Sequence, residues 1–321
     1  MERLGFKFWY HLRRGCQAAL GLLDRLEGWA SARLQNYPLE LARRHRASIV
    51  SVIQRHHMAA HPDEGYYARQ YWHWLGEGLE RWAQKGPGAQ QPQILDLGCG
   101  QGRLTIPLAR WAADRGGRVV GVDFAAEVLE EARKLALEEG LAPVIEWREA
   151  DIPTFLQDQP AASYDVVACL EVLYALPGYR QALGEVARVM RPGGVLFAGF
   201  RPRYFNLLSA LASGRWTALP MLLTGSEGYP FGPPTWLAWQ SAREVREILT
   251  GAGFTVTGLW GIGICSGIAG DPLASLAQPS RLSPAKQEAL MEVELALAAD
   301  LADCGRYILA AAWKKGNYPE D

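Results

Sequence analysis

Residues 93–104, QILDLGCGQGRL, join an apolar run to a glycine-rich turn. The run reaches Asp96 and then gives way to glycines at positions 98, 100 and 102. A buried strand followed by such a turn and a helix typically opens a site for a nucleotide-like ligand. Glycines let the backbone approach the ligand, and the helix start offers free N–H groups. Because Arg103 stands where the dinucleotide pattern requires its third glycine, the spacing argues against a nicotinamide cofactor.

Apolar runs and helical patterns alternate from this point onward. Runs typical of buried strands lie at 94–97, 118–123, 144–148, 164–170, 194–200, 254–264 and 306–313. Amphipathic helical patterns lie among them at 103–114, 125–139, 178–190 and 241–252. Alternation of this kind predicts an α/β fold in which helices cover both faces of a mostly parallel sheet.

Helical patterns also precede the alternating region, at 17–34, 39–58 and 66–84. The Pro, Gly and Gln residues of 84–93 indicate a linker. We therefore predict a helical cap or lid over residues 1–84, followed by a main domain. The main domain would span 94–315, with a substrate-covering insert at 201–240 and a helical insert at 265–305.

Acidic side chains follow successive strands of the predicted sheet. Asp96 ends the first strand, Asp123 ends the second, and Asp151 follows the third. The carboxyl ends of parallel strands meet at one edge, where ligands of such sheets bind. Asp123 is placed to accept hydrogen bonds from a pair of ribose hydroxyls, and Asp151 from an exocyclic adenine amine. Glu171 and Tyr174 follow the fourth strand at the same edge.

The chain resembles the class I S-adenosylmethionine-dependent methyltransferases in five stretches: ILDLGCGQG, VVGVDF, EADIP, YDVVACLEVLYALP and RVMRPGGVLFAGF. The layout is similar to that of small-molecule enzymes such as the ubiquinone-pathway O-methyltransferases. The resemblance covers about residues 94–315. It implies a Rossmann-like, seven-stranded sheet with an antiparallel last strand, and S-adenosylmethionine as the cofactor.

The resemblance also implies roles for the matched positions. The implied cofactor residues are Asp96, Gly98, Cys99, Gly100 and Gly102 at the methionine moiety, Asp123 at the ribose, Phe124 on one adenine face, Asp151 and Ile152 at the adenine edge, and Leu170 at the end of strand four. Asp123 alone could be a helix cap, and Asp151 alone a turn residue. The ordered set favours a binding site over these structural roles.

The identity of a general base is left open by the sequence. In the related O-methyltransferases strand four typically ends in E-x-x-E-H; Glu171 matches the first Glu, and Tyr174-Ala175 stands at the His position. All six histidines lie within the first 73 residues, so an imidazole base would come from the N-terminal helices or a partner chain. The catalytic candidates are His73, Glu171 and Tyr174, with a purely structural His73 as the alternative. No metal site is expected, because His57 and His61 have ligand spacing but lack a third ligand.

Aromatic and arginine side chains cluster after the fifth predicted strand. The candidates for substrate contact, including one from the N-terminal helices, are Tyr71, Arg201, Arg203, Tyr204 and Trp236. Aromatic walls with one or two arginines suit a small, flat or hydrophobic molecule that carries an acidic group. Methylation at oxygen is the leading hypothesis. The alternatives are N- or C-methylation, a cofactor-binding assembly protein without catalysis, and an enzyme acting on a lipid-like substrate at a membrane surface.

Charge and cysteine content limit the partners. The 321 residues carry a formal net charge of −1, so no global field favours nucleic acid. Residues 1–60 nevertheless hold ten Lys or Arg against four Asp or Glu. Peripheral membrane contact through that segment therefore stays open, as does a homodimer. Five scattered cysteines without a C-x-x-C pair, and no apolar run long enough to span a membrane, predict a cytoplasmic protein.

Overall fold

The computed structural model describes residues 44, 45, 47, 61–85 and 90–316. The helix predicted at 17–34 lies outside these residues. Of the helix predicted at 39–58, only Arg44, His45 and Ala47 are described, and all three are helical. The helix predicted at 66–84 is confirmed as α3 (Glu64–Lys85).

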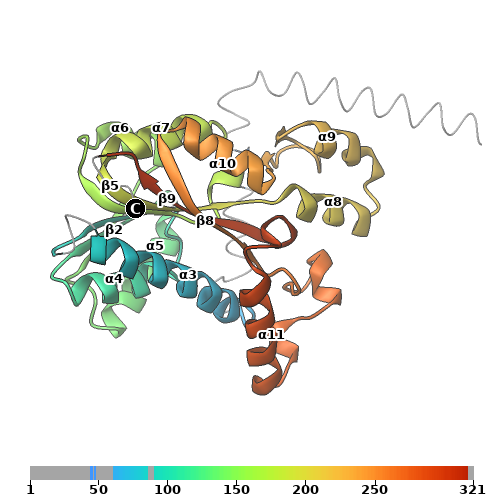
Figure 1. Ribbon diagram of the computed structural model, residues 1–321, viewed down its shortest axis with the longest axis horizontal. Helices are drawn as coiled ribbons and strands as arrows, with labels where there is room; N and C mark the ends of the chain where they lie inside the picture. Colours follow the sequence, from blue (N-terminus) through green and yellow to red (C-terminus); the bar gives the residue numbers. More distant parts are fainter. Residues whose placement is uncertain (1–43, 46, 48–60, 86–89, 317–321) are drawn as a thin grey trace, which may run out of the picture.

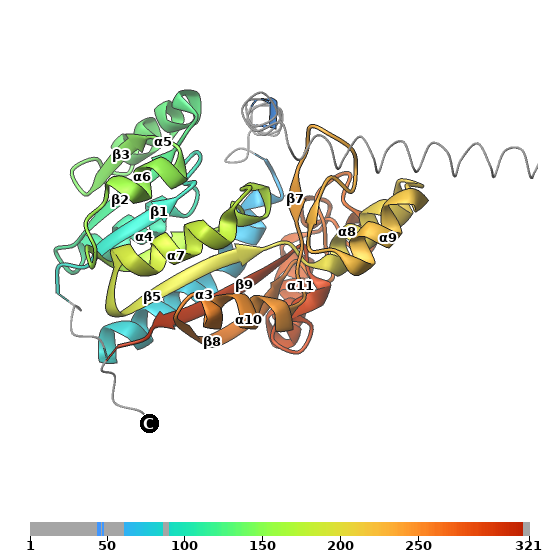
Figure 2. The same cartoon turned by 90° about the horizontal axis from the view of Figure 1, so that it is seen from above.

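A seven-stranded sheet forms the centre of the molecule (Figure 1, Figure 2). Its strands, in spatial order, are β3 (Ile145–Glu149), β2 (Arg118–Asp123), β1 (Gln93–Leu97), β4 (Tyr164–Cys169), β5 (Met190–Phe200), β9 (Tyr307–Lys314) and β8 (Phe254–Ile262). β9 runs antiparallel to both of its neighbours, and the other neighbouring pairs are parallel. The predicted sheet with an antiparallel last strand is therefore confirmed.

Helices cover both faces of this sheet (Figure 1). One layer holds α3, α4 (Thr105–Ala113) and α5 (Ala126–Glu138), and the other holds α6 (Ile152–Asp158), α7 (Tyr179–Val189) and α10 (Ala242–Gly251). Each layer has its own cluster of buried apolar side chains. Every residue of β4 is buried, as expected of a strand covered on both faces. The strand is mostly apolar, and its one charged residue, Asp165, pairs with Arg191.

The helix α3 runs across one face of the sheet, from the carboxyl ends of the strands to their amino ends. Its buried side chains recur every three or four residues, at Tyr67, Tyr71, Leu75, Leu79 and Trp82. At the end of α3, Trp82 Nε1 donates to the Gly193 carbonyl near the start of β5, at 3.1 Å. At its beginning, Glu64 pairs with Arg103, which follows the glycine loop after β1. The first turns of α3 therefore lie at the edge where the predicted acids gather.

Two insertions extend beyond the carboxyl ends of the strands (Figure 2). The first holds α8 (Arg203–Ala212), α9 (Leu219–Thr224), β6 (Glu227–Gly228) and β7 (Leu237–Ala238), and the second holds α11 (Pro284–Leu297). Glu294 of α11 is 1% exposed and accepts hydrogen bonds from the hydroxyls of Tyr66, at 2.8 Å, and Ser266, at 3.0 Å. This buried network fastens the second insertion to α3. No helix among the described residues has the length and apolar character to cross a membrane.

The strand β5 begins at Met190, four residues before the predicted start at 194. Tyr164 of β4 pairs with Met190, and the register then shifts before Val166 pairs with Val195. The stretch RPGG therefore forms an irregular first part of the strand. Gly193 adopts a φ of 78° there, which glycine tolerates without a steric penalty.

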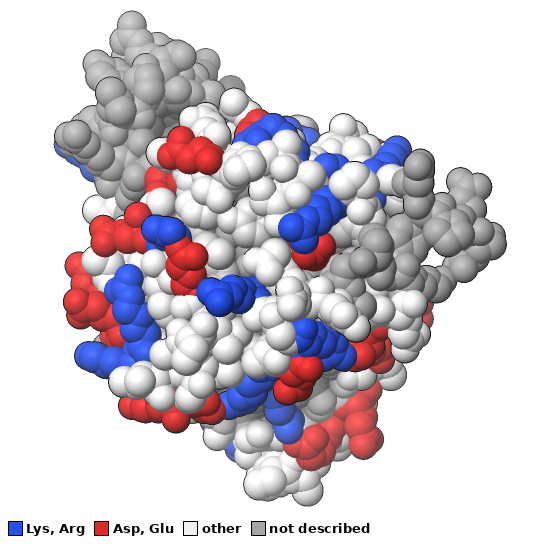
Figure 3. Space-filling model, turned by 90° about the vertical axis from the view of Figure 1, so that its left-hand side faces the viewer, with Lys and Arg blue, Asp and Glu red and all other residues white. Residues whose placement is uncertain are grey.

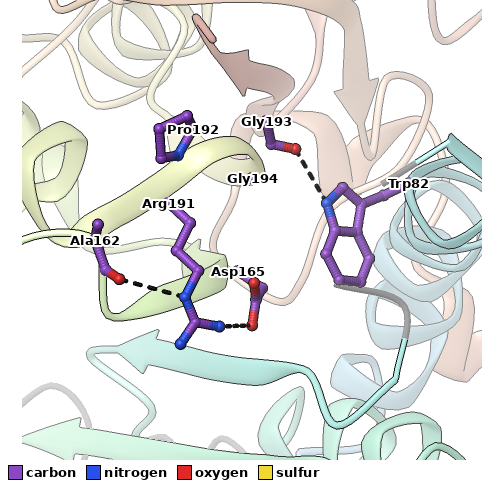
Figure 4. Close-up of a pocket in the computed structure, with 7 residues that line it drawn as sticks. All are labelled: Trp82, Ala162, Asp165, Arg191, Pro192, Gly193 and Gly194. Carbon is purple, nitrogen blue, oxygen red and sulfur yellow. Dashed lines mark hydrogen bonds and ion pairs between the residues drawn. The ribbon is translucent and has the colours of Figure 1, made fainter. Parts of the chain in front are cut away.

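A hollow at the amino ends of β4 and β5 is lined by structural contacts (Figure 4). Asp165 pairs with Arg191 and also accepts from the Gln93 amide at 2.9 Å. The indole of Trp82 forms another side of the hollow (Figure 4). This hollow lies at the opposite edge of the sheet from the glycine loop, so it is not the predicted site. The surface in Figure 3 intermixes acidic and basic side chains, without a large patch of one sign.

Candidate active site

The glycine loop after β1 is tied to the end of β2. The amides of Gly98 and Cys99 donate to the Val122 carbonyl at 2.7 and 3.0 Å. The loop glycines 98, 100 and 102 have φ values between 51° and 83°, a region that favours glycine. A Cβ at Gly98 would collide with a neighbouring side chain, whereas a Cβ at Gly100 would meet nothing within 4 Å. The open space at Gly100 is a cradle in which a ligand can approach the backbone.

Asp123 holds the glycine loop from the end of β2. Its Oδ2 accepts from the Gly100 amide and its Oδ1 from the Ala125 amide, each at 3.0 Å. The residue is 5% exposed. Burial raises the pKa of Asp123, although the backbone N–H groups act in the opposite direction. A carboxylate oxygen has more than one lone pair, so Asp123 can still accept from the hydroxyls of a ligand.

Asp96 occupies the carboxyl half of β1. Its Oδ2 accepts from the Thr105 hydroxyl of α4 at 2.6 Å. Burial raises the pKa of Asp96 to about 6, and the charge of Asp123 acts in the same direction. An approaching cation favours the ionised form of such a carboxyl. Asp96 is therefore suited to the positively charged part of a ligand.

The third acid, Asp151, follows β3. The Ala150 amide donates to the Asp123 carbonyl at 3.0 Å, which joins the ends of β2 and β3. Asp151 is partly buried at the start of α6. The structure thus brings the predicted cofactor set to one edge of the sheet. Its remaining members, mostly buried, are Cys99, Phe124, Ile152 and Leu170.

Glu171 and Arg103 form an ion pair where β4 ends. Arg103 Nη2 lies 2.8 Å from Glu171 Oε1, and Nη1 pairs with Glu64 of α3. Burial would raise the pKa of Glu171, but the charges of Arg103, Arg306 and Arg201 hold it below its usual value. Glu171 also has a φ of 58°, which is uncommon for a residue with a Cβ. A backbone held in this region is typical of functional sites.

The hydroxyl of Tyr71 is buried near this ion pair. Its oxygen makes no hydrogen bond of normal geometry among the described residues, although it interacts with the Glu171 side chain. Burial raises the pKa of the Tyr71 phenol well above its usual value, and the Glu171 charge adds to the rise, so the phenol stays protonated. The Arg103 guanidinium lies 5.7 Å from the centre of the Tyr71 ring. A buried polar group without a partner costs about 1–3 kcal/mol, which a polar ligand group would recover.

Three aromatic rings surround Arg201, the residue that follows β5. Its guanidinium carbon lies 4.1 Å from the ring centre of Tyr307, 4.6 Å from that of Phe205 and 4.7 Å from that of Tyr174. Arg201 Nη2 donates to the Tyr307 hydroxyl at 2.9 Å. The Tyr174 and Tyr307 rings are 5.7 Å apart. The carboxyl ends of β4 and β5 thus carry an aromatic wall with a cation in it.

Comparison with known proteins assigns this arrangement to a family. Residues 94–194 match a family model described as a methyltransferase domain. The chain is 32% identical over 168 residues to the ubiquinone biosynthesis O-methyltransferase of Actinobacillus pleuropneumoniae serotype 5b, an alignment that covers 51% of this chain and 69% of that protein. The chain belongs to the class I S-adenosylmethionine-dependent methyltransferases.

One further relative agrees with this assignment, and one solved structure shares the fold. A protein also named ubiquinone biosynthesis O-methyltransferase, from Pectobacterium carotovorum, is 36% identical over 167 residues, covering 51% of this chain and 67% of that one. A solved structure from Listeria monocytogenes, described as an S-adenosylmethionine-dependent methyltransferase, has a TM-score of 0.50 at 18% identity. It covers 79% of this chain and 100% of that chain, and it supports the fold alone.

The loop region of this methyltransferase fits S-adenosylmethionine, the cofactor of its class. The cradle over Gly100 offers room beside the backbone. The buried Asp123 offers acceptors for hydroxyls, and Asp96 offers a carboxyl that ionises beside a cation. These three features match a ligand that carries a ribose and a positively charged amino acid end.

Three of the residues predicted for this methyltransferase do not join the cluster. His73 lies two positions after Tyr71, which places it about 200° around the helix. Its Nε2 is 3.5 Å from Glu77, and its side chain is 40% exposed, so the structure does not place it as a base. Arg203 pairs with Glu244 of α10 at 2.7 Å, and Tyr204 is 45% exposed.

Among the histidines that the structure describes, His45 contacts backbone groups at this edge. Its Nε2 lies 2.7 Å from the carbonyl oxygen of Ala175, in the short helical turn η1 (Leu173–Ala175) after β4. Its Nδ1 lies 3.4 Å from the amide nitrogen of Trp236 in the first insertion. Trp236 itself is 8% exposed and packs in the core. Both ring nitrogens of His45 contact backbone groups, so the residue holds two elements together.

Proposed function

We propose that this methyltransferase transfers the methyl group of S-adenosylmethionine to an oxygen atom of a small aromatic or hydrophobic molecule. The observation that carries the proposal is the Tyr71 hydroxyl, which is buried beside the Glu171 side chain and makes no hydrogen bond of normal geometry among the described residues. A hydroxyl of the acceptor would be its missing partner. The relatives named ubiquinone biosynthesis O-methyltransferase support oxygen as the accepting atom, and make quinol-like phenols the first class to test.

The cofactor roles are part of the proposal. Asp123 would bind the ribose hydroxyls, and Asp151 the adenine amine. Asp96 and the glycine loop would hold the methionine end. The apolar or small side chains proposed to complete the site are Cys99, Phe124, Ile152 and Leu170.

The acceptor residues would act by alignment. Methyl transfer is an in-line displacement at carbon, so the direction of the attacking oxygen contributes strongly to the rate. Bound S-adenosylmethionine supplies an electrophilic methyl group. Tyr71 would hydrogen-bond the acceptor oxygen, and the ionised carboxylate of Glu171, beside Arg103, would accept the proton that this oxygen loses as the methyl group is transferred to it. The rings of Tyr174 and Tyr307 would exclude water from the acceptor.

Incubation with S-adenosylmethionine and a panel of phenols, catechols and hydroquinones tests this function. We expect products heavier by one methylene unit, with the new methyl signal assigned to an ether by NMR. Tyr71→Phe should lower turnover about tenfold and leave S-adenosylhomocysteine affinity within about twofold. Tyr204→Phe is the matched control, because Tyr204 is exposed. Products methylated at a ring carbon would contradict the proposal, and so would cofactor binding without turnover of any panel member.

The N-terminal cap is a further part of the proposal. The contacts of His45 with Ala175 and Trp236 support a cap formed by the region before α3. Contact of residues 1–60 with a membrane surface, a homodimer and a cytoplasmic location stay predictions. Removal of residues 1–60 should lower turnover far more than cofactor binding if the cap is correct.

A further inference from the structure

Three arginines lie around the carboxyl ends of the strands, and two of them have carboxylate partners. Arg103 pairs with Glu64 and Glu171, and Arg306 pairs with Asp271. Arg201 forms no ion pair within the described part of the chain. Its polar partners are neutral: the Arg306 carbonyl at 3.0 Å and the Tyr307 hydroxyl at 2.9 Å.

Arg201 therefore has N–H donor groups that no hydrogen bond to a described residue uses. A guanidinium carries five N–H groups, and each of these two hydrogen bonds uses one. The other N–H groups have no partner among residues 44, 45, 47, 61–85 and 90–316. The side chain is only partly exposed and lies among three aromatic rings. Glu171 and Asp271 act on this guanidinium electrostatically without pairing with it. Its unused N–H groups still cost free energy, which hydrogen bonds to an anion arriving with a ligand would offset.

We propose that Arg201 binds a carboxylate carried by the acceptor molecule, so that the enzyme methylates aromatic acids. This inference rests on the proposed O-methyltransferase function. Tyr307, which accepts a hydrogen bond from Arg201, also interacts electrostatically with Tyr71 and Glu171. An acceptor in this cluster would place its hydroxyl at Tyr71, its ring along Tyr174 and Tyr307, and its acid group at Arg201.

A carboxylate suits the cluster better than a phosphate. The three arginines face three carboxylates, those of Glu64, Glu171 and Asp271, so the cluster is balanced in charge before an acceptor binds. A singly charged acid would be offset by the sulfonium charge of the cofactor. A doubly charged phosphate would leave excess negative charge in a largely buried site. The planar guanidinium also matches the planar carboxylate.

Paired acceptors that differ only in charge test the inference. We would use 3,4-dihydroxybenzoate and its methyl ester. A charge-assisted hydrogen bond of about 1.5–3 kcal/mol predicts that kcat/KM for the acid exceeds that for the ester by about 10- to 100-fold. Arg201→Met should remove this preference, chiefly by raising KM for the acid, and leave the ester within about twofold. Calorimetric binding of both compounds to the S-adenosylhomocysteine complex should show the same loss without turnover.

Two variants and a stability measurement complete the design. Arg203→Met makes the same chemical change two residues away, at a side chain paired with Glu244, and should keep the acid preference. Arg201→Lys keeps the charge but not the planar fork, and should recover part of the preference. Thermal unfolding of each variant shows whether a lost acid preference comes from the site itself or from loss of the folded structure.

The possible outcomes separate the two proposals. The carboxylate assignment would be overturned if the wild type methylated acid and ester with equal kcat/KM, or if Arg201→Met lowered kcat/KM equally for both. O-methylation would still stand. A fall in kcat with both acceptors, together with a shifted pH–rate profile, would assign Arg201 to the reacting oxygen instead. If neither compound is methylated, the proposed function fails for this class of phenol. The calorimetric comparison then still decides whether Arg201 binds the acid.

Discussion

The imidazole of His45 bridges the carbonyl of Ala175 and the amide of Trp236. Because the Trp236 N–H donates to Nδ1 at 3.4 Å, the hydrogen of the neutral ring lies on Nε2, which donates to the Ala175 oxygen at 2.7 Å. Ala175 directly follows Tyr174, and Trp236 belongs to the first insertion. One side chain from the N-terminal region therefore joins two elements that flank the proposed acceptor site.

Substitution of His45 should affect the acceptor and spare the cofactor. His45→Ala removes two hydrogen bonds of about 1 kcal/mol each, so we expect KM for the acceptor to rise about five- to tenfold. The affinity for S-adenosylhomocysteine should stay within about twofold. Steady-state kinetics and calorimetry measure the two quantities. His73→Ala is the control and should change neither; a large fall in kcat in that variant alone would restore His73 as the base.

Substitutions of Asp123, at the end of β2, and of Asp151, after β3, should weaken cofactor binding to different extents. Asp123→Ala removes charge-assisted hydrogen bonds to the ribose and the two bonds to the amides of Gly100 and Ala125, so affinity should fall by about 100-fold or more. Asp151→Asn keeps an acceptor oxygen and should weaken binding by about tenfold or less. Calorimetric titration with S-adenosylhomocysteine gives both values. An Asp123→Ala variant with unchanged affinity would contradict the cofactor assignment.

The raised pKa of Asp96 links stability to pH. Its folded-state pKa of about 6 lies above the ordinary value of 3.8, so the unfolded chain releases this proton first as pH rises. The contribution of Asp96 to stability is therefore full below about pH 3.8 and is lost as pH rises through 6, by roughly 3 kcal/mol. Asp96→Asn does not titrate. Denaturant unfolding should therefore show the wild type losing stability relative to Asp96→Asn across this range, and a constant difference would refute the shift.

The buried carboxylate of Glu294 should be essential to the docking of α11. It accepts from Tyr66 and Ser266, and also from the Cys265 amide at 2.7 Å and from Gln70. Glu294→Ala would leave these buried donors without an acceptor, which should lower the free energy of unfolding by about 3 kcal/mol or more. Glu292→Ala, an exposed change on the same helix, should lower it by less than about 0.5 kcal/mol. Urea unfolding of the two variants makes the comparison.

The sheet and the cofactor edge could be predicted because local patterns determine them. The run before Gly98 must be a buried strand, and Asp123 can be placed because it ends the next apolar run. The burial of Tyr71 follows from the three- and four-residue spacing along α3. The same periodicity places His73 on the opposite side of α3, a consequence that the prediction of His73 as a base did not take into account.

The acceptor side could not be predicted in the same way, because long-range contacts determine it. Arg103 joins Glu64 and Glu171, which are far apart in sequence. Arg201 and Arg203 look equivalent in the sequence, yet only Arg201 contacts Tyr307, whereas Arg203 pairs with Glu244. No local pattern distinguishes the two arginines. Their roles follow from the direction in which the chain leaves β5.

The helix α3 is anchored at both of its ends, which limits where this chain can be joined to a relative in a hybrid protein. Trp82 holds one end at Gly193, and Glu64 holds the other at Arg103. A single inserted residue between them would rotate one anchor by about 100° relative to the other. An N-terminal segment taken from a relative would therefore have to be joined in front of Glu64. A crossover placed in the linker at 84–93 would carry a foreign α3 onto this sheet and misalign Tyr71 in the resulting hybrid.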